Sequence, residues 1–397
     1  MPQHPITDEE KAYWKDIRKQ FYLTEGVTHM DGGAIGPSAR PPFEKLIDLM
    51  RELEAHPLKV EAQIEHGEME ETREKIGAFT GADPGRLAFV QNSTMGMNIP
   101  AQGLPFEAGT EIVMTNQEYP AVRMLWRYIA ERDNLVLREI PLPMPPESGQ
   151  DIIDAYAEQV NDNTSVMIYS HVYCTTGLIT DVTALSELAR RHGAIAIADG
   201  AHAVGVIPVS IEDVGCDFYI SSCHKWLLAP KGTGFVYIAP HLQNKVLPLI
   251  KGYSLAPSDT AARYDMTGTR DMTFFAGLGF ALDYQLDIGW ENRIRPYCLK
   301  LAAYVRKRAL ALPGVRLLAP DDPELNGFLT TFTIDGTDME ALARILYDQY
   351  AIQVQSPDCG GIRALRVTTH FYSSFEDIDY LMDTTETILA GEQATQK

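Results

Sequence analysis

Apolar runs and helix-like stretches alternate along the first two-thirds of the chain. Several of the runs are continuous in Val, Ile, Ala or Met rather than alternating with polar residues, which is typical of strands buried on both faces. The predicted strands are Leu87–Val90, Glu111–Thr115, Leu135–Ile140, Ser165–Ser170, Ala194–Ala198, Phe218–Ser221 and Phe235–Ile238. The helix-like stretches between them lie near 67–79, 119–132, 151–160 and 182–192. This order predicts an α/β fold with a doubly wound, mostly parallel sheet between helices.

The pattern differs at the two ends of the chain. Thr7 followed by Glu10 resembles a capping box and predicts a helix that runs to about Phe21. After about residue 275 long helices and short strands replace the alternation, which predicts a smaller α+β domain. Its predicted helices lie near 275–288, 290–311 and 376–390, and its strands near 328–334 and 364–368.

Composition narrows the classes of function. The chain has 397 residues, with 34 Lys and Arg against 54 Asp and Glu, for a net charge of −20. Such acidity disfavours binding to nucleic acid, whose phosphates need a basic surface. No apolar run approaches the roughly 18 residues of a membrane span, and residues 1–10 lack the apolar core of a signal peptide. We therefore expect a cytoplasmic protein that binds neither nucleic acid nor membrane.

Motif spacing excludes two further kinds of site. The five cysteines have no CxxC spacing, so the sequence predicts neither a disulfide framework nor a metal site. A nucleotide-binding α/β protein is an alternative class, but neither GxGxxG nor GxxxxGK[ST] follows a predicted strand.

Polar residues follow the predicted strands where a doubly wound sheet collects its ligands. Ser93 and Thr94 come just after Leu87–Val90, at a turn into a helix. Free backbone N–H groups and the helix dipole make such a turn suitable for an anion. The alternative is that Ser93 or Thr94 is only the N-cap of the next helix.

Asp199 and His202 follow the strand at 194–198. An Asp at that place is often only an N-cap for the next helix. The other interpretation is a carboxylate aimed at a cationic ring nitrogen, with His202 placed to bind a second oxygen of the same ligand.

Lys225 stands one βα unit later, in Ser222-Cys223-His224-Lys225-Trp226. A lysine in a poorly solvated turn loses part of its preference for the charged form, and a neutral amine attacks carbonyls. Lys231 lies in a Pro-Lys-Gly sequence that is typical of a loop, and we expect it to be an ordinary solvated lysine. An amine, a carboxylate and an anion site together match the aldehyde, ring nitrogen and phosphate of pyridoxal 5′-phosphate.

Asp199-Gly200-Ala201-His202 followed by Ser222-Cys223-His224-Lys225 resembles the class V, fold-type I family of pyridoxal phosphate-dependent aminotransferases. Cysteine desulfurases, isopenicillin N epimerase-like proteins and C–S lyases are relatives in that family. The resemblance implies an N-terminal helix and arm (1–30), a large cofactor-binding domain (31–275), a small domain (276–397) and a homodimer with the active site at the subunit interface.

The resemblance also implies roles for individual residues. Lys225 would form a Schiff base with the cofactor, Asp199 would bind the pyridine nitrogen and His202 the ring hydroxyl. Tyr119 would stack on the ring, and Thr269 would reach a phosphate across the dimer interface. The implied phosphate ligands are Ser93, Thr94, Ser222 and His224, and the implied substrate residues are Arg366, Cys174 and His29.

Two cysteines mark departures from the desulfurase pattern. Cys174 stands where desulfurases have an asparagine, so substrate handling should differ. Cys359 lies near the place of the desulfurase nucleophile, but only seven residues before Arg366 and beside Asp358, which disfavours its thiolate. A structural role for Cys359 is therefore the preferred interpretation, and a desulfurase that uses it is an alternative.

The family's motifs serve several reactions on the Cα of an amino acid or amino-acid conjugate. From the sequence we place transamination or β-elimination ahead of epimerisation. A catalytically retired fold that serves as a binding module is the alternative of another class, and the intact set of Lys225, Asp199 and His202 argues against it.

Overall fold

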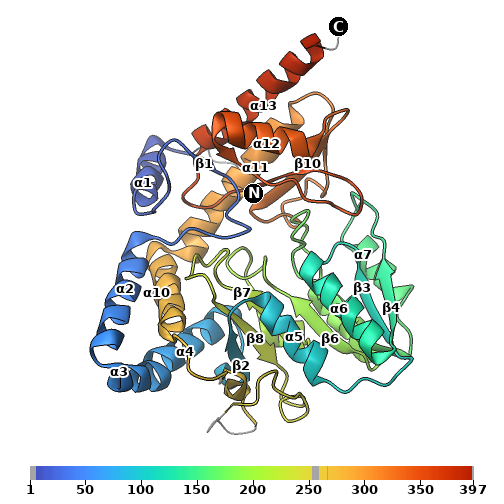
Figure 1. The fold of residues 1–397 in the computed structure, drawn as a ribbon. Coiled ribbons are helices and arrows are strands. Elements are labelled where there is room, and N and C mark those ends of the chain that lie inside the picture. Colours follow the sequence, from blue (N-terminus) through green and yellow to red (C-terminus); the bar gives the residue numbers. More distant parts are fainter. Residues whose placement is uncertain (1–5, 253–258, 266, 396–397) are drawn as a thin grey trace.

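The computed structural model describes residues 6–252, 259–265 and 267–395. Figure 1 shows two parts joined by a long helical run, with the large sheet in the lower part and the C-terminal elements in the upper part. The large sheet has seven strands in the order β2-β8-β7-β6-β5-β3-β4. Their bounds are β2 Leu87–Val90, β3 Glu111–Thr115, β4 Val136–Ile140, β5 Thr164–Ser170, β6 Ile195–Asp199, β7 Phe218–Ser222 and β8 Gly234–Ile238.

The sheet is parallel except at β8. Strands β4, β3, β5, β6 and β7 pair in parallel, whereas β8 is antiparallel to both of its neighbours, β7 and β2. Every strand but β8 therefore ends at the same edge of the sheet. The predicted α/β fold with a mostly parallel sheet is confirmed.

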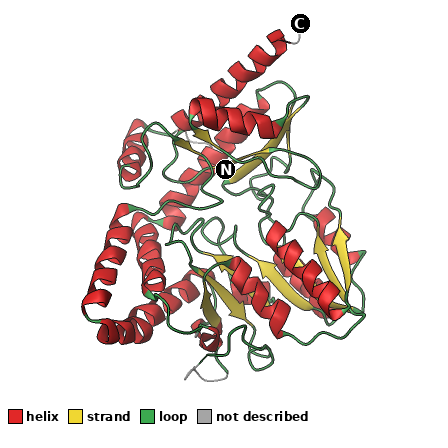
Figure 2. Ribbon diagram, in the orientation of Figure 1, coloured by secondary structure: helices red, strands yellow, loops and turns green. Residues whose placement is uncertain are grey.

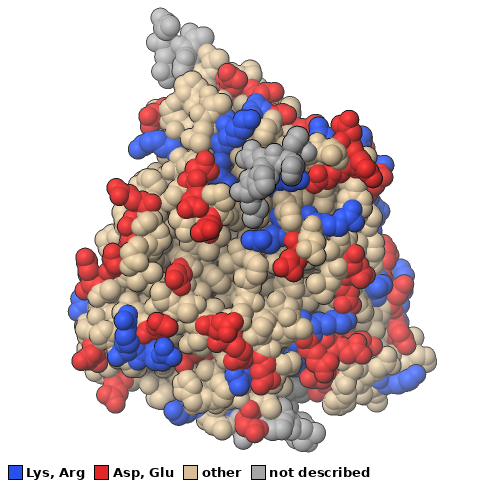
Figure 3. Space-filling view, turned by 180° about the vertical axis from the view of Figure 1, so that it is seen from behind, with Lys and Arg blue, Asp and Glu red and all other residues tan. Residues whose placement is uncertain are grey.

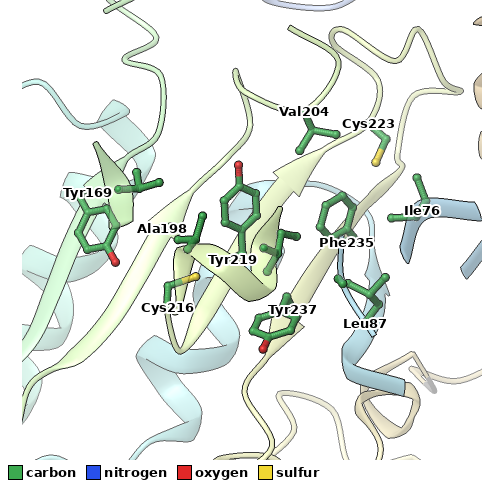
Figure 4. Close-up of a cluster of buried hydrophobic side chains, with 14 of the residues drawn as sticks. Ile76, Leu87, Tyr169, Ala198, Val204, Cys216, Tyr219, Cys223, Phe235 and Tyr237 are labelled. Atoms are coloured by element: carbon green, nitrogen blue, oxygen red, sulfur yellow. The ribbon is translucent and has the colours of Figure 1, made fainter. Parts of the chain in front are cut away.

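Both faces of the sheet are buried, which explains why the strands are apolar without alternation. In β2, Leu87 and Phe89 pack on one face, while Ala88 and Val90 pack on the other. Figure 4 shows part of the first face, where Tyr169, Tyr219 and Phe235 lie among smaller side chains. Helices cover each face. They are α2 Arg40–Ala55, α3 Pro57–Gln63, α4 Met69–Thr80, α5 Ser93–Gly103, α6 Pro120–Asp133, α7 Gln150–Ala157, α8 Val182–Arg191, α9 Ile211–Val214 and α10 Thr273–Ile288.

A second core lies in the upper part of Figure 1. A three-stranded antiparallel sheet, β12-β10-β9, packs there with helices from both ends of the chain. These elements are α1 Asp8–Arg18, α11 Arg295–Leu310, β9 Val315–Leu317, β10 Leu329–Ile334, α12 Met339–Tyr350, β12 Leu365–Thr368 and α13 Phe375–Thr395. Strand β1 (Thr28–His29) pairs in parallel with β11 (Ile352–Gln353). The N-terminal arm thus packs with this core, while the three domain boundaries remain predictions.

The surface carries mixed charge. Figure 3 shows acidic and basic side chains interspersed over the rear face, without a continuous basic area. In the described ranges of the chain, no helix is both long and apolar enough to cross a membrane.

Candidate active site

The predicted site residues meet at the edge where the parallel strands end. Turns after β2, β3, β5, β6 and β7 reach this edge, and Figure 2 shows loops gathered between the sheet and the upper part. Because parallel strands share this edge, residues from about 92 to 225 come together despite their distance in sequence.

Lys225 follows β7 and is 9% exposed. Its Nζ atom lies 5.6 Å from the centroid of the Tyr119 ring. Burial lowers the pKa of the Lys225 amine below the usual value of 10.5, and the nearby Asp199 carboxylate acts in the opposite direction. Gly36 packs directly on this turn, since a Cβ atom there would lie 2.2 Å from the Lys225 carbonyl oxygen. A side chain at residue 36 would therefore displace the lysine.

Trp226 anchors the lysine turn to the second core. Its ring is 1% exposed and stacks on His370, with ring centroids 5.9 Å apart and planes 19° apart. The ring also meets Phe328 edge-on at 5.8 Å. The turn that carries Lys225 is therefore held between the sheet and the C-terminal core.

Asp199 ends β6 and does not cap a helix. Its Oδ1 atom accepts a hydrogen bond from the Ala201 N–H at 3.0 Å, in a turn. A Cβ atom at Gly200 would lie 2.1 Å from the Tyr219 ring, so only glycine fits after this carboxylate. Burial raises the pKa of Asp199 above its usual value, and Lys225 opposes that shift.

His202 is buried beside the lysine turn. Its Nδ1 atom accepts a hydrogen bond from the Trp226 indole N–H at 3.3 Å. Burial lowers the pKa of His202 well below 6.5, so the ring is neutral at pH 7. A neutral imidazole that accepts at Nδ1 carries its proton on Nε2. His202 is thus a hydrogen-bond donor, as a partner for a ring hydroxyl oxygen should be.

The predicted phosphate ligands surround the start of α5. The Ser93 N–H donates to Ser222 Oγ at 2.8 Å, and Ser222 Oγ donates to Ser93 Oγ at 3.0 Å. Asn92, not Ser93 or Thr94, caps α5 by accepting from the Met95 N–H at 2.9 Å. The N-cap alternative for Ser93 and Thr94 is therefore wrong, and both hydroxyls are available at a helix N-terminus.

His224 lies two residues after Ser222, in the turn that follows β7. Its Nδ1 atom lies 3.2 Å from the Thr233 carbonyl oxygen, so Nδ1 carries the proton and Nε2 is an acceptor when the ring is neutral. Burial lowers its pKa. A neutral His224 would bind a phosphate only through a protonated phosphate oxygen or after gaining a proton itself.

Tyr119 and Glu118 follow β3. Tyr119 is 40% exposed and presents its ring to the Lys225 amine. Glu118 is fully buried and accepts hydrogen bonds from Ser170 Oγ at 2.5 Å and Thr115 Oγ1 at 2.9 Å. Burial raises the pKa of Glu118 to about 7. The sequence did not single out Glu118, although an acidic residue three positions after an apolar strand was a signal for it.

Arg366 lies on β12 and reaches the edge of the sheet. Its guanidinium donates to the Cys174 carbonyl oxygen at 2.9 Å and forms a buried ion pair with Asp31 at 3.0 Å. Its Nε atom is buried and has no hydrogen-bond partner among the residues that the structure describes. The predicted segment around His29 therefore contributes Asp31 to the Arg366 cluster, a contact the sequence did not suggest.

A cavity of about 580 Å³ opens beside these residues. Its lining includes side chains after β3, after β5 and around β12, among them Tyr119, Arg123, Cys174, Gln355, Arg363 and Arg366. Burial raises the pKa of the Cys174 thiol to about 11, so it is protonated at neutral pH. The substrate side of the site is thus a cationic cavity with a neutral thiol in its wall.

Three residues that the sequence analysis considered for the site do not line this cavity. His29 is in β1, with its ring 6.0 Å from Tyr372, and does not line this cavity. Thr269 is exposed in the segment before α10. Cys359 is 0% exposed, its Sγ lies 3.8 Å from the Thr175 carbonyl oxygen, and burial raises its pKa to about 12. A thiol in this state is a poor nucleophile.

Pyridoxal 5′-phosphate fits the donor set of this edge. A buried amine of lowered pKa, a buried carboxylate, a neutral imidazole donor and two serine hydroxyls at a helix N-terminus match its aldehyde, ring nitrogen, ring hydroxyl and phosphate. The family model described as aminotransferase class V matches residues 52–381. The chain belongs to the class V aminotransferase family.

Several known proteins resemble the chain over almost its whole length. It is 32% identical to an isopenicillin N epimerase of Streptomyces clavuligerus, over 96% of this chain and 99% of that one. It is 25% identical to a probable cysteine desulfurase of Methanothermobacter thermautotrophicus, over 94% and 98%.

Solved structures share the fold. A mutant of the cystine C–S lyase C-DES, with glycine linked to its pyridoxal phosphate, matches with a TM-score of 0.84 at 22% identity, over 93% of this chain and 98% of that one. Cysteine desulfurase from Thermococcus onnurineus matches with a TM-score of 0.81 at 23% identity, over 98% and 100%. The predicted family, cofactor and enzyme class are confirmed: the chain is a pyridoxal 5′-phosphate-dependent enzyme of aminotransferase fold.

Proposed function

We propose that this enzyme transfers the Cα proton of an amino acid or amino-acid conjugate, with epimerisation as the net reaction. The supporting observation is that two proton-transferring groups lie at one edge of the sheet, the amine of Lys225 after β7 and the thiol of Cys174 after β5. The likeness to isopenicillin N epimerases, which covers at least 93% of each chain, moves epimerisation ahead of transamination and β-elimination.

The chain's own residues divide the work. Bound pyridoxal phosphate would supply an electron sink for the charge that develops at Cα. Asp199 would hold the proton on the pyridine nitrogen, and His202 would donate to the ring hydroxyl oxygen. Tyr119 would cover the ring, while Ser93 and Ser222 would bind the phosphate.

Lys225 and Cys174 would move the proton. The amine of Lys225, neutral at lower pH than a free lysine, would remove the Cα proton as general base. The protonated thiol of Cys174 would return a proton from the other side of Cα. Arg366 would hold the substrate carboxylate. That carboxylate must either displace Asp31 from the guanidinium or share the guanidinium with it.

Proton exchange in deuterated water tests this proposal. Wild-type enzyme should incorporate deuterium at Cα and invert configuration, whereas Cys174→Ala should exchange deuterium and retain configuration. Formation of a 2-oxo acid without inversion would show transamination instead, and release of pyruvate with ammonia would show β-elimination. A relative that is 25% identical over 74% of this chain, from Schizosaccharomyces pombe, is named a hercynylcysteine sulfoxide lyase, so a lyase reaction is the second candidate.

We also propose a homodimer in which Thr269 of one subunit reaches the phosphate of the other. Thr269 is exposed, as a residue with that role in a second subunit should be. Thr269→Ala should weaken pyridoxal phosphate binding severalfold and leave the fold intact. A fully active monomer would contradict this role.

A further inference from the structure

The cavity beside Tyr119 contains more positive charge than one substrate carboxylate needs. Three arginines line it, Arg123, Arg363 and Arg366, although the whole chain has a net charge of −20. In an acidic protein, arginines that converge on a cavity of about 580 Å³ point to an anionic ligand. The arginine that binds such a ligand needs hydrogen-bond donors that are not already engaged by the protein.

Two of the arginines are paired with neighbouring carboxylates, although Arg123 shares the Glu139 carboxylate with Arg127. Arg123 donates from Nε and Nη2 to the same Glu139 oxygen, at 3.2 and 2.9 Å. Arg366 is buried and paired with Asp31, next to the place assigned to the α-carboxylate. Neither accounts for a second anionic group farther out in the cavity.

Arg363 is held loosely. Its Nη1 atom donates to the Ser356 carbonyl oxygen at 3.2 Å, and its nearest carboxylate, on Glu340, lies 3.9 Å away. The Arg363 side chain is 53% exposed and that of Glu340 is 70% exposed. An ion pair of this length and exposure contributes little, so the guanidinium is free to bind a ligand.

The backbone that carries Arg363 is ordered by a tight hairpin. Asp358 bridges Arg363 across it, the Cys359 N–H donates to the Ile362 carbonyl oxygen at 2.9 Å, and the Gly361 N–H donates to Asp358 Oδ1 at 2.6 Å. Asp358 also lines the cavity, where its carboxylate accepts this hydrogen bond of the turn and is outnumbered by the three arginines. Because three residues of extended chain span about 10 Å, Arg363 stands well apart from Arg366.

We propose that Arg363 forms a subsite for a second carboxylate, so that the preferred substrate is an amino acid with an acidic group at the far end of its side chain. This inference rests on the proposed function, because Arg366 must hold the α-carboxylate. A charged ligand on one guanidinium typically gains about tenfold or more in affinity.

A matched pair of ligands tests the subsite. 2-Aminoadipate and norleucine have six carbons each and differ by the distal carboxylate. Their dissociation constants are measured by cofactor absorbance and by calorimetry on the pyridoxal phosphate-loaded enzyme. Wild-type enzyme should favour 2-aminoadipate about tenfold, and Arg363→Gln should abolish that preference while changing norleucine binding less than about twofold. Arg316→Gln, which removes another exposed arginine with a carboxylate partner, should keep the preference.

The outcomes separate the two proposals. Equal binding of both amino acids to wild-type enzyme, or a preference that survives in Arg363→Gln, would overturn the subsite and leave the proposed function standing. If neither amino acid perturbs the bound cofactor, the subsite is overturned, whereas the proposed function is decided by the deuterium-exchange experiment.

Discussion

The two walls of the site are built by different means. The cofactor wall consists of Asp199, His202 and Lys225 in turns directly after buried strands. The substrate wall consists of Arg366, in the short strand β12 of the second core, and Arg363, just before that strand. The first wall is fixed by the sheet and can vary little without loss of the cofactor. The second wall depends on loops, so substitutions there can change its charge and shape while the cofactor wall stays the same. This is consistent with one family catalysing several reactions.

Among the variants that test the two walls, loss of Lys225 should have the largest effect on the rate of Cα proton exchange. Lys225→Ala should lower the rate of Cα proton exchange by about 10⁴-fold, since it removes the general base. Exchange is measured by proton NMR in deuterated water. Lys231→Ala is the matched control, because Lys231 is exposed and donates to the Gly36 carbonyl oxygen at 2.8 Å. Equal rates for the two variants would contradict the assignment.

The pH dependence of stability tests the burial of Glu118, which lies at the same edge of the sheet as the cofactor wall. Its pKa is raised from 4.5 to about 7 in the folded state, so the fold binds an extra proton between those values. Stability from this group is therefore lost as pH rises from about 4.5 to about 7, by about 3 kcal/mol in total. Glu118→Gln should remove that loss. Urea unfolding at pH 5 and pH 8 measures it, and an unchanged difference between the two pH values would refute the effect.

On the substrate wall, Arg366→Lys should act on binding rather than on chemistry. Lysine keeps the charge beside Asp31 but loses the bidentate geometry of the guanidinium. KM should rise about tenfold, with kcat changed less than about threefold. Steady-state kinetics of Cα exchange gives both constants, and a fall in kcat alone would argue that Arg366 does not hold the substrate carboxylate.

Cys359 should have the smallest effect. Because its thiol is buried in the loop behind the substrate wall and its pKa is raised to about 12, Cys359→Ala should change the exchange rate less than about twofold. The cost in stability should be about 1 kcal/mol for the lost packing. Sulfide release from cysteine that disappears in this variant would instead support the desulfurase alternative.

The same contrast explains what the sequence could predict. The strands of the large sheet were found within one residue at each end, because burial on both faces leaves continuous apolar runs. Lys225, Asp199 and His202 follow those strands, so their meeting at one edge could be anticipated. Helices α2 and α12 were missed, since neither follows the β-α-β order that guided the prediction.

The substrate wall could not be predicted to the same depth. The pair of Asp31 with Arg366 joins residues 335 positions apart, and no local pattern encodes such a contact. The orientation of Cys359 toward the Thr175 carbonyl is decided by packing around the hairpin, not by its neighbours in sequence. Long-range contacts of this kind depend on how the second core docks against the sheet.

Borohydride trapping tests the central claim most directly. Enzyme loaded with pyridoxal phosphate is reduced, digested and mapped by mass spectrometry. The account predicts that the reduced cofactor is attached to Lys225. Attachment to Lys231 or any other lysine, or no attachment at all, would contradict it.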